Sequence, residues 1–338
     1  MEQRLDTLKL LNFSTHKRDL ALFENDWTRI AAFVRGHGFD GIELLPVGDY
    51  PFECMPSELV HSIHLRFFIF LRAMWRQDMD ALEKQFGSMD NVQMFYGGRD
   101  RECIVNTYVT QLDLAETLEC RTVVFHPAQC DLDHVYDWQF PWHWQETIDI
   151  CAEILNQALK KSRYTGWLLF ENLWWPGSFR LDHPEEYEYL RKKMDYDRCG
   201  IVLDTGHMLN CSGSVNVNEP DAIEYLISRA RDMGTLRHEI KALHLTCSLS
   251  GEYIRKSTGG KPPLNPGDDF WARLSVARKH VGRIDPHDPF TMPEVGRFVE
   301  MIQPEQVVFE FSFRDIPAWE QKIRLQKAAL ARVLWAHG

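Results

Sequence analysis

Eight short apolar runs, separated by longer amphipathic segments, constrain the fold of this chain more than any other feature of its sequence. Continuous apolar runs of this length are typical of strands that are buried on both faces of a parallel sheet. The runs lie at 8–14, 41–46, 61–67, 121–127, 166–172, 200–205, 240–246 and 306–312. Eight such strands that alternate with helices predict a (β/α)8 TIM barrel of the α/β class.

The segments between these runs have the spacing of apolar residues that amphipathic helices show. A doubly wound open sheet would give the same alternation, so the order of elements leaves closure of the barrel open. No glycine-rich phosphate-binding turn follows the first run, which disfavours a dinucleotide-binding sheet. The predicted helices are 26–36, 101–119, 144–162, 184–194, 219–232 and 317–335, the last with Pro317 in its first turn.

One connection is much longer than a single helix requires. Residues 247–304 separate the last two predicted strands, and they include the Gly- and Pro-rich stretch STGGKPPLNPGDD at 257–269. Such a composition predicts a surface loop, and a loop at this place could cover a site as a lid. We therefore expect one domain over residues 1–338, with an insertion between strands 7 and 8 at about 247–304.

Composition excludes some classes of protein. The chain has 338 residues, 44% of them hydrophobic, and 38 Lys and Arg against 49 Asp and Glu, for a formal charge of -11. This balance disfavours a general nucleic-acid binder. The start of the chain does not resemble a secretory signal. The most apolar segment is interrupted by Arg66 and Arg72, which disfavours a membrane span. The eight cysteines form no C-x-x-C pair. We expect a cytoplasmic protein without a membrane partner, with a small-molecule substrate, and we leave a homo-oligomer open.

Carboxylates and imidazoles recur at one end of almost every predicted strand. Taken singly, each has an ordinary explanation: a histidine beside apolar residues can be a hydrogen-bonded core residue, and Asp204 can be the N-cap of the next helix. The residues concerned are Glu43, His64, His126, Glu171, Asp204, His207, His244, Asp285, His287 and Glu310. In a parallel barrel these strand ends meet at one face, and burying so many ionisable groups there is costly without a cation. Mixed imidazole and carboxylate ligands favour zinc, manganese or iron.

Six segments carry a resemblance to a known family. They are VVFHP, LLFEN, GIVLDTGH, IKALHL, DPH and VVFEF, in this order along the chain. In this combination the chain resembles the xylose isomerase-like TIM barrel superfamily, which includes AP endonuclease family 2 (endonuclease IV) and many sugar isomerases and epimerases. The resemblance implies a barrel with a divalent metal centre, holding one to three ions of Mn2+, Zn2+ or Fe.

The two branches of this superfamily imply different numbers of metal ions. In the endonuclease branch, His64 and His126 would hold one ion, and Glu171 would bridge it to a second. Asp204, His244 and Glu310 would complete the second site, and a third site would consist of His207, Asp285 and His287. In the isomerase branch, only Glu171, Asp204, His244 and Glu310 would be used, around one manganese or a similar ion. The sequence departs from the endonuclease pattern at HLTCS, at NLWWPG and in the long insertion.

The hypothesis ranked first is an isomerase or epimerase acting on a sugar, polyol or related carbonyl compound. One ion would grip the substrate's oxygens and stabilise an enediolate. Glu171 and Glu310 would remove and return the proton as the catalytic pair. Glu43 would touch the substrate unless its strand is purely structural. Four tryptophans would stack on the sugar or, alternatively, pack between helix and loop: Trp142, Trp144, Trp174 and Trp175.

The alternative hypothesis is a di- or trinuclear phosphoesterase, which the complete set of nine ligands favours. The acidic charge argues against duplex DNA as its substrate, whereas a small phosphorylated compound escapes that objection. Arg66, Arg255, Lys256 and Lys261 could bind such a compound, or could be solvated surface residues. A third hypothesis is a non-catalytic barrel that uses the metal ligands for stability. The number of bound ions separates these hypotheses.

Overall fold

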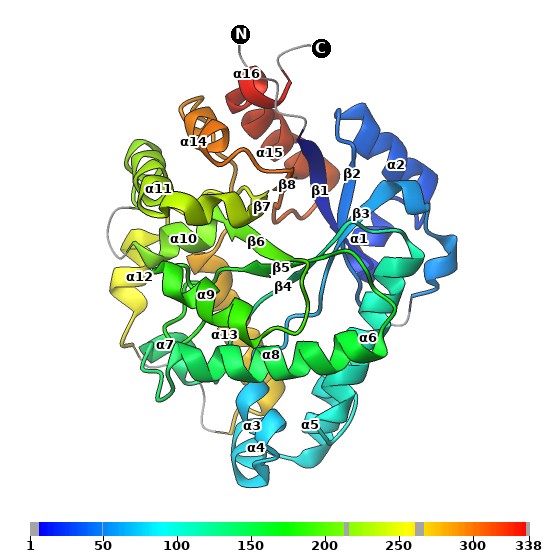
Figure 1. Cartoon of the computed structure of the whole chain (residues 1–338), viewed down its shortest axis with the longest axis vertical. Helices are drawn as coiled ribbons and strands as arrows, with labels where there is room; N and C mark the ends of the chain where they lie inside the picture. Colours follow the sequence, from blue (N-terminus) through cyan, green and yellow to red (C-terminus); the bar gives the residue numbers. More distant parts are fainter. Residues whose placement is uncertain (1–6, 49, 213–215, 261–266, 336–338) are drawn as a thin grey trace.

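Eight parallel strands close into a barrel in the order of the sequence (Figure 1), as a computed structural model shows. The structure describes residues 7–48, 50–212, 216–260 and 267–335. The strands are β1 (Leu8–Ser14), β2 (Gly41–Leu45), β3 (Val60–His64), β4 (Thr122–Phe125), β5 (Trp167–Glu171), β6 (Cys199–Asp204), β7 (Ile240–His244) and β8 (Gln306–Phe309). β1 pairs with both β2 and β8, which closes the barrel and excludes the open sheet. The predicted fold class is therefore confirmed.

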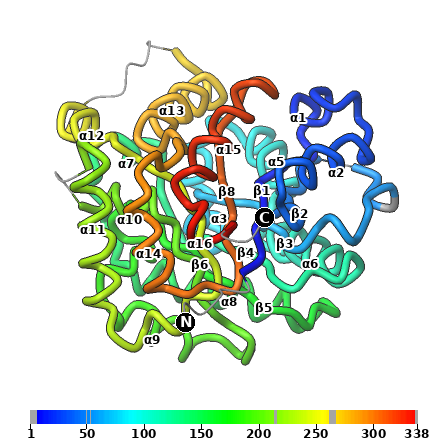
Figure 2. The backbone as a smooth tube through the Cα atoms, turned by 90° about the horizontal axis from the view of Figure 1, so that it is seen from above, coloured from blue at the N-terminus to red at the C-terminus, as the bar shows by residue number. Residues whose placement is uncertain are grey.

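Helices surround the barrel on all sides (Figure 2). They are α1 (Lys17–Ala21), α2 (Trp27–Gly36), α3 (Leu71–Arg76), α4 (Met79–Phe86), α5 (Met89–Tyr96), α6 (Glu102–Thr117), α7 (His134–Asp137), α8 (Trp144–Lys161), α9 (Pro184–Lys193), α10 (Thr205–Cys211), α11 (Glu219–Asp232), α12 (Gly251–Ser257), α13 (Phe270–Ile284), α14 (Val295–Ile302), α15 (Ile316–Ala329) and α16 (Ala331–Leu334). All six predicted helices are present, but the last one is divided at Leu330 into α15 and α16. No helix in the described ranges combines the length and the apolar character that crossing a membrane requires.

Two long connections build up one side of the barrel. The expected insertion after β7 contains α12, α13 and α14, while residues 261–266 of its Gly- and Pro-rich stretch lie outside the described residues. A second insertion, which the sequence did not reveal, places α3, α4 and α5 between β3 and α6. The two insertions are in contact, because the Phe270 ring lies 4.3 Å from that of Phe86 and Trp271 Nε1 donates to Asn91 Oδ1 at 2.9 Å.

A small apolar layer lies inside the barrel, below the candidate site. It consists of Val124, Leu169, Val202 and Ala242, all fully buried and separate from the main core between barrel and helices. Side chains alternate along a strand, so residues two positions apart point the same way. The inward residues that come two positions later in the chain are His126, Glu171, Asp204 and His244. The alternation of side chains that places the apolar layer inside the barrel therefore also directs these four ionisable side chains to the opening at the carboxyl ends of the strands.

Candidate metal centre

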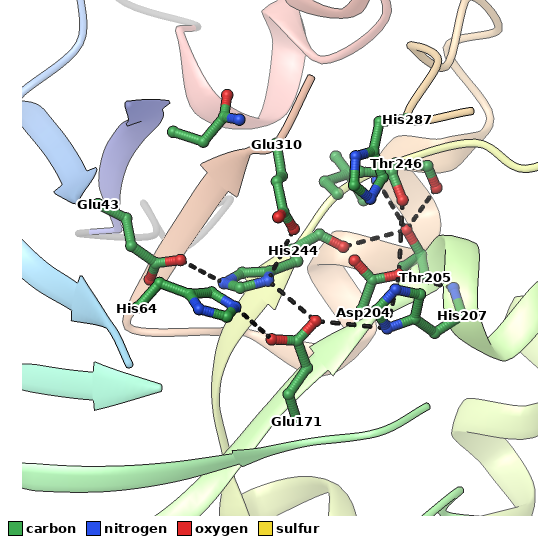
Figure 3. Close-up of polar contacts among 12 residues, drawn as sticks. Glu43, His64, Glu171, Asp204, Thr205, His207, His244, Thr246, His287 and Glu310 are labelled. Atoms are coloured by element: carbon green, nitrogen blue, oxygen red, sulfur yellow. Dashed lines mark hydrogen bonds and ion pairs between the residues drawn. The ribbon is translucent and has the colours of Figure 1, made fainter. Parts of the chain in front are cut away.

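The nine candidate ligands come together at the carboxyl ends of the strands, in three adjoining groups (Figure 3). In each group, one ligand atom per residue lies within 4.8 Å of all the others. The groups are His64, His126 and Glu171; Glu171, Asp204, His244 and Glu310; and His207, Asp285 and His287. These are the three groups that the family resemblance implied, and Glu171 belongs to two of them.

Glu171 directs its two carboxylate oxygens to different groups. Its Oε2 lies 3.1 Å from His126 Nε2 and 3.4 Å from His64 Nε2. Its Oε1 lies 3.3 Å from His244 Nδ1, which in turn is 2.9 Å from Glu310 Oε2. The side chain is 1% exposed. A carboxylate in this position can bridge two ions, one on each side.

Asp204 is both a helix cap and a member of the central group. Its Oδ1 accepts a hydrogen bond from His207 N at 2.6 Å and caps α10, whereas its Oδ2 is buried without a hydrogen-bond partner in the described structure. The turn at Gly206 between them is crowded, because an added Cβ would lie 2.3 Å from Thr246 Oγ1. The strand therefore ends in an acid and an imidazole that serve two neighbouring ligand groups.

The outer group is built from α10 and from the loop after α13. Asp285 Oδ2 lies 3.1 Å from His207 Nε2 and 2.7 Å from His287 Nε2. Ser248 Oγ donates to the other oxygen of Asp285 at 2.9 Å, and His207 Nδ1 contacts the carbonyl of Asn172 at 2.8 Å. These contacts fix the direction of both side chains, so the third group is as well supported as the other two.

Glu43 contacts the candidate ligand His244 on the side of the ring that faces away from the central group. Its Oε1 lies 2.9 Å from His244 Nε2, and its Oε2 accepts a hydrogen bond from Ser62 Oγ at 2.7 Å. The other ring nitrogen of His244 faces Glu171 and Glu310. A carboxylate that holds the far nitrogen of a ligand histidine fixes its tautomer and orientation. Glu43 also reaches the wall of a cavity, but its contacts make it first a partner of His244.

Two asparagines hold strand ends together just beyond the regular sheet. Asn172 accepts a hydrogen bond from Asp204 N at 2.8 Å and donates to Asp204 O at 3.0 Å. Asn12 does the same for Phe311, accepting from its N–H at 3.0 Å and donating to its carbonyl at 3.1 Å. Asn172 follows Glu171 and Phe311 follows Glu310, so each pair of bonds fixes the backbone next to a central ligand. Neither asparagine was among the site residues expected from the sequence.

The site pulls the pKa values of its members in both directions. Burial raises the pKa of Asp204 to about 7. Burial also opposes the charged forms of His287 and Glu310, but their neighbours outweigh it: Asp285 raises the pKa of His287 to about 9, and His244 lowers that of Glu310 to about 2. Ionisable groups that lie close together and have pKa values shifted in opposite directions are typical of functional sites.

The buried polar atoms fit divalent ions. Within the described part of the chain, both oxygens of Glu171, Asp204 Oδ2, His244 Nδ1 and Glu310 Oε2 are buried without a hydrogen-bond partner. Buried polar atoms are rarely left in this way, and imidazole with carboxylate is a donor set that suits zinc, manganese or iron. The residues present therefore match a metal centre in both chemistry and position.

Two cavities open onto the ligands, with volumes of about 640 and 850 Å3, and they share Leu45, His64 and Glu310. Trp174 and Trp175 line the larger one, where the Trp174 ring lies 4.9 Å from that of His207. Trp142 is not among the residues that line either cavity in the described structure, and it packs on Phe140 at 5.3 Å.

The remaining aromatic and basic candidates lie farther from the ligands or outside the described residues. The edge of Trp144 contacts Tyr189, with ring centroids 5.5 Å apart. Of the four basic candidates, Arg66 lines the larger cavity, Arg255 and Lys256 lie on α12, and Lys261 falls outside the described residues. The structure therefore brings Arg66 alone of these candidates, together with Trp174 and Trp175, to the described cavity walls.

Comparison with known proteins identifies the family. The xylose isomerase-like TIM barrel family, AP endonuclease family 2, matches residues 31–270, well over half of the chain. The chain belongs to this family. The family match confirms the resemblance seen in the sequence motifs.

Two solved structures share the fold over nearly the whole chain. Endonuclease IV from Thermus thermophilus is 15% identical, with 96% of this chain and 99% of that chain covered and a TM-score of 0.55. A D-tagatose 3-epimerase-like protein is 16% identical, with 97% and 99% covered and a TM-score of 0.53. No curated protein matches the sequence significantly. One of the two structures is named for an endonuclease and the other for an epimerase, so the likeness leaves the reaction open.

Proposed function

We propose that this family member is a multinuclear metal-dependent hydrolase that cleaves a phosphoester bond in a small phosphorylated compound. The observation that carries the proposal is the division of the Glu171 oxygens between two ligand groups. An isomerase needs only the central group, with one oxygen of Glu171 free to take a proton. Here the second oxygen faces His64 and His126, so Glu171 is better suited to bridging than to proton transfer.

The outer group supports the same choice. His207, Asp285 and His287 are held by their own hydrogen bonds and do not belong to the central group that an isomerase would use. Two or three divalent ions supply a nucleophile from water near neutral pH and neutralise the charge of a phosphate group. The formal charge of -11 and the tryptophans in the cavity favour a small substrate over a DNA duplex.

The residues of the chain divide the remaining tasks among them. His64 and His126 would hold the first ion, and Asp204 and His244 the second, with Glu171 between them and Glu43 keeping His244 in orientation. Glu310 has 18% of its side chain exposed and lines both cavities. Because its pKa is lowered to about 2, mainly by His244 acting against burial, it is a carboxylate at neutral pH and can orient a water molecule by accepting a hydrogen bond from it.

The test combines metal counting with an activity assay on the purified protein. We expect two or three zinc, iron or manganese ions per chain by elemental analysis, and hydrolysis of phosphoesters in a panel of phosphorylated sugars, polyols and nucleotides. His287→Asn should lower the count by about one ion while the protein stays folded. A single ion per chain together with an absence of phosphoester hydrolysis would overturn the proposal.

The aromatic wall of the larger cavity favours a second candidate, a sugar isomerase or epimerase. Phe67, Trp174 and Trp175 line the cavity, and aromatic rings of this kind can stack on the apolar face of a sugar. This candidate requires one ion in the central group, with Glu171 and Glu310 transferring the proton. One manganese per chain and interconversion of ketoses in deuterated water, with deuterium incorporated next to the carbonyl carbon, would establish it.

A further inference from the structure

Two arginines line the larger cavity together with metal ligands. Arg66 lies in the connection after β3, and Arg278 lies on α13 in the insertion after β7. The same cavity is lined by seven of the nine ligands, so it runs without interruption from the arginines to the candidate metal centre. A compound bound at the ligands can therefore extend to the arginines.

Among the described residues, neither arginine has a carboxylate partner. Within the described structure no Asp or Glu oxygen lies within ion-pair distance of Arg66 or Arg278, although the chain has 49 acidic residues and 38 basic ones. Both side chains line the same cavity, so their positive charges act on one shared space. Two neighbouring positive charges without an acid form a place where an anion is stabilised.

The guanidinium of Arg66 is held in position before any ligand arrives. Its Nη2 donates to the carbonyl of Phe95 at 2.5 Å, and its central carbon lies 4.4 Å from the centre of the Phe68 ring. The backbone of Arg66 is fixed as well, by hydrogen bonds to Gln111 at 2.8 Å and from Tyr108 at 3.0 Å. These contacts use only one of the five N–H donors of the guanidinium, which leaves a planar fork that matches an oxyanion.

We propose that Arg66 and Arg278 bind a second anionic group of the substrate, a phosphate or carboxylate remote from the bond that is cut. This inference rests on the proposed function for the reacting end of the molecule. The wall of the same cavity also presents Phe67 and Trp175, together with Thr107 and Thr110 of α6. The substrate class is therefore a small compound with an anionic group at each end and an uncharged middle section.

Binding of compounds that cannot be hydrolysed tests the site without relying on turnover. The probes are propylphosphonate, with one anionic group, and alkane bisphosphonates with three, four and five carbons between the phosphorus atoms. A matching series of phosphonocarboxylates tells whether the second group is read as phosphate or carboxylate. By titration calorimetry on the purified protein, we expect at least one bisphosphonate or phosphonocarboxylate to bind about tenfold more tightly than propylphosphonate.

Variants separate the arginine site from the metal centre. Arg66→Gln and Arg278→Gln should each remove the tenfold gain and leave propylphosphonate binding unchanged. Arg278 is exposed on its helix, so its variant should fold even if that of the half-buried Arg66 does not. Arg283→Gln is the matched control, because this residue lies on the same helix but packs over Tyr253 at 4.0 Å and is not among the residues lining the cavity.

The outcomes for the two proposals are distinguishable. A gain that is absent for every chain length, or that persists in both arginine variants, would overturn the anion site. If the gain is present and is lost in the variants while no phosphoester is hydrolysed, the anion site is supported and the proposed reaction fails.

Discussion

Two successive layers inside the same barrel have opposite chemistry. Val124, Leu169, Val202 and Ala242 form a fully buried apolar layer, and two residues later the same four strands supply His126, Glu171, Asp204 and His244. The layers share strands, face and register. The lower layer needs only the right volume, whereas the upper one needs charges in fixed places. The comparison indicates that the apolar layer serves as the platform on which the ligands are aligned.

The layers should also differ in what they contribute to stability. Apolar side chains in the lower layer stabilise the fold by being removed from water. The upper layer buries several ionisable groups in contact with one another, which costs free energy unless cations are bound. Substitutions in the apolar layer should therefore change the free energy of unfolding. Substitutions in the layer of ionisable residues should change metal content and activity.

Glu171→Gln should have the largest effect. The variant keeps the shape of the side chain but loses the charge that two ligand groups share, so we expect activity to fall on the order of a thousandfold and metal content to decrease. Steady-state kinetics and elemental analysis measure both. Glu305→Gln, the same change at the opposite end of the barrel, is the control and should leave both unchanged. Wild-type activity in Glu171→Gln would refute the role of this residue.

Leu169→Ala tests the layer below, two residues away on the same strand. Removing a fully buried leucine should lower the free energy of unfolding by about 2–5 kcal/mol, because a cavity is left in the barrel. Chemical denaturation followed by circular dichroism measures this change. The number of ions per folded chain should stay the same. A variant with normal stability and fewer ions would contradict the division between the two layers.

Glu43→Gln should have a smaller effect, since this carboxylate acts on the metal only through His244. Loss of such a partner typically weakens metal affinity by about 10- to 100-fold, which competition with a chromogenic chelator measures. Ser62→Ala removes only the hydrogen bond to Glu43 and should weaken affinity less. If Glu43→Gln changed substrate binding but not metal affinity, Glu43 would contact the substrate instead.

The pH dependence of metal uptake tests the ligand groups without any substitution. Burial raises the pKa of Asp204 to about 7, and Asp285, acting against burial, raises that of His287 to about 9. Both groups must lose a proton to bind an ion, so zinc affinity of the metal-free protein should rise from pH 6 to 9, by about tenfold per unit where one proton is released. His287→Asn should flatten the upper part of this rise. Equal affinity across the range would contradict the assignment.

Most of the fold followed from the sequence because the signal was local. All eight apolar runs are strands, although His126 and Glu310 lie one residue beyond theirs, since the apolar run continues after the sheet hydrogen bonds end. The helices α3, α4 and α5 were missed because they are too short to be stable alone and depend on contacts such as Phe86 with Phe270, far away in the chain. The single domain and the cytoplasmic location stay predictions.

The position of the ligands also followed from the sequence, because parallel strands end at a common face. Contacts between side chains on opposite sides of the barrel could not be predicted from the sequence. Glu43 on β2 meets His244 on β7, although these strands are not neighbours in the sheet, and this depends on how the barrel closes. That Arg66 has no acidic partner among the described residues is likewise a property of the folded chain. Asn172 resembles an ordinary turn residue and Asn12 an ordinary strand residue until their backbone partners are seen.

The two asparagine side chains have a consequence for how such a protein can diversify. Asn172 bonds to the backbone of Asp204 at the end of β6, and Asn12 of β1 bonds to the backbone of Phe311 just after β8, so the loops after β5 and β8 start from anchored points. Insertions and replacements farther along those loops can then change which substrates fit the cavity without moving the candidate metal ligands. A protein built in this way can change its substrate in evolution while its candidate metal ligands stay in place.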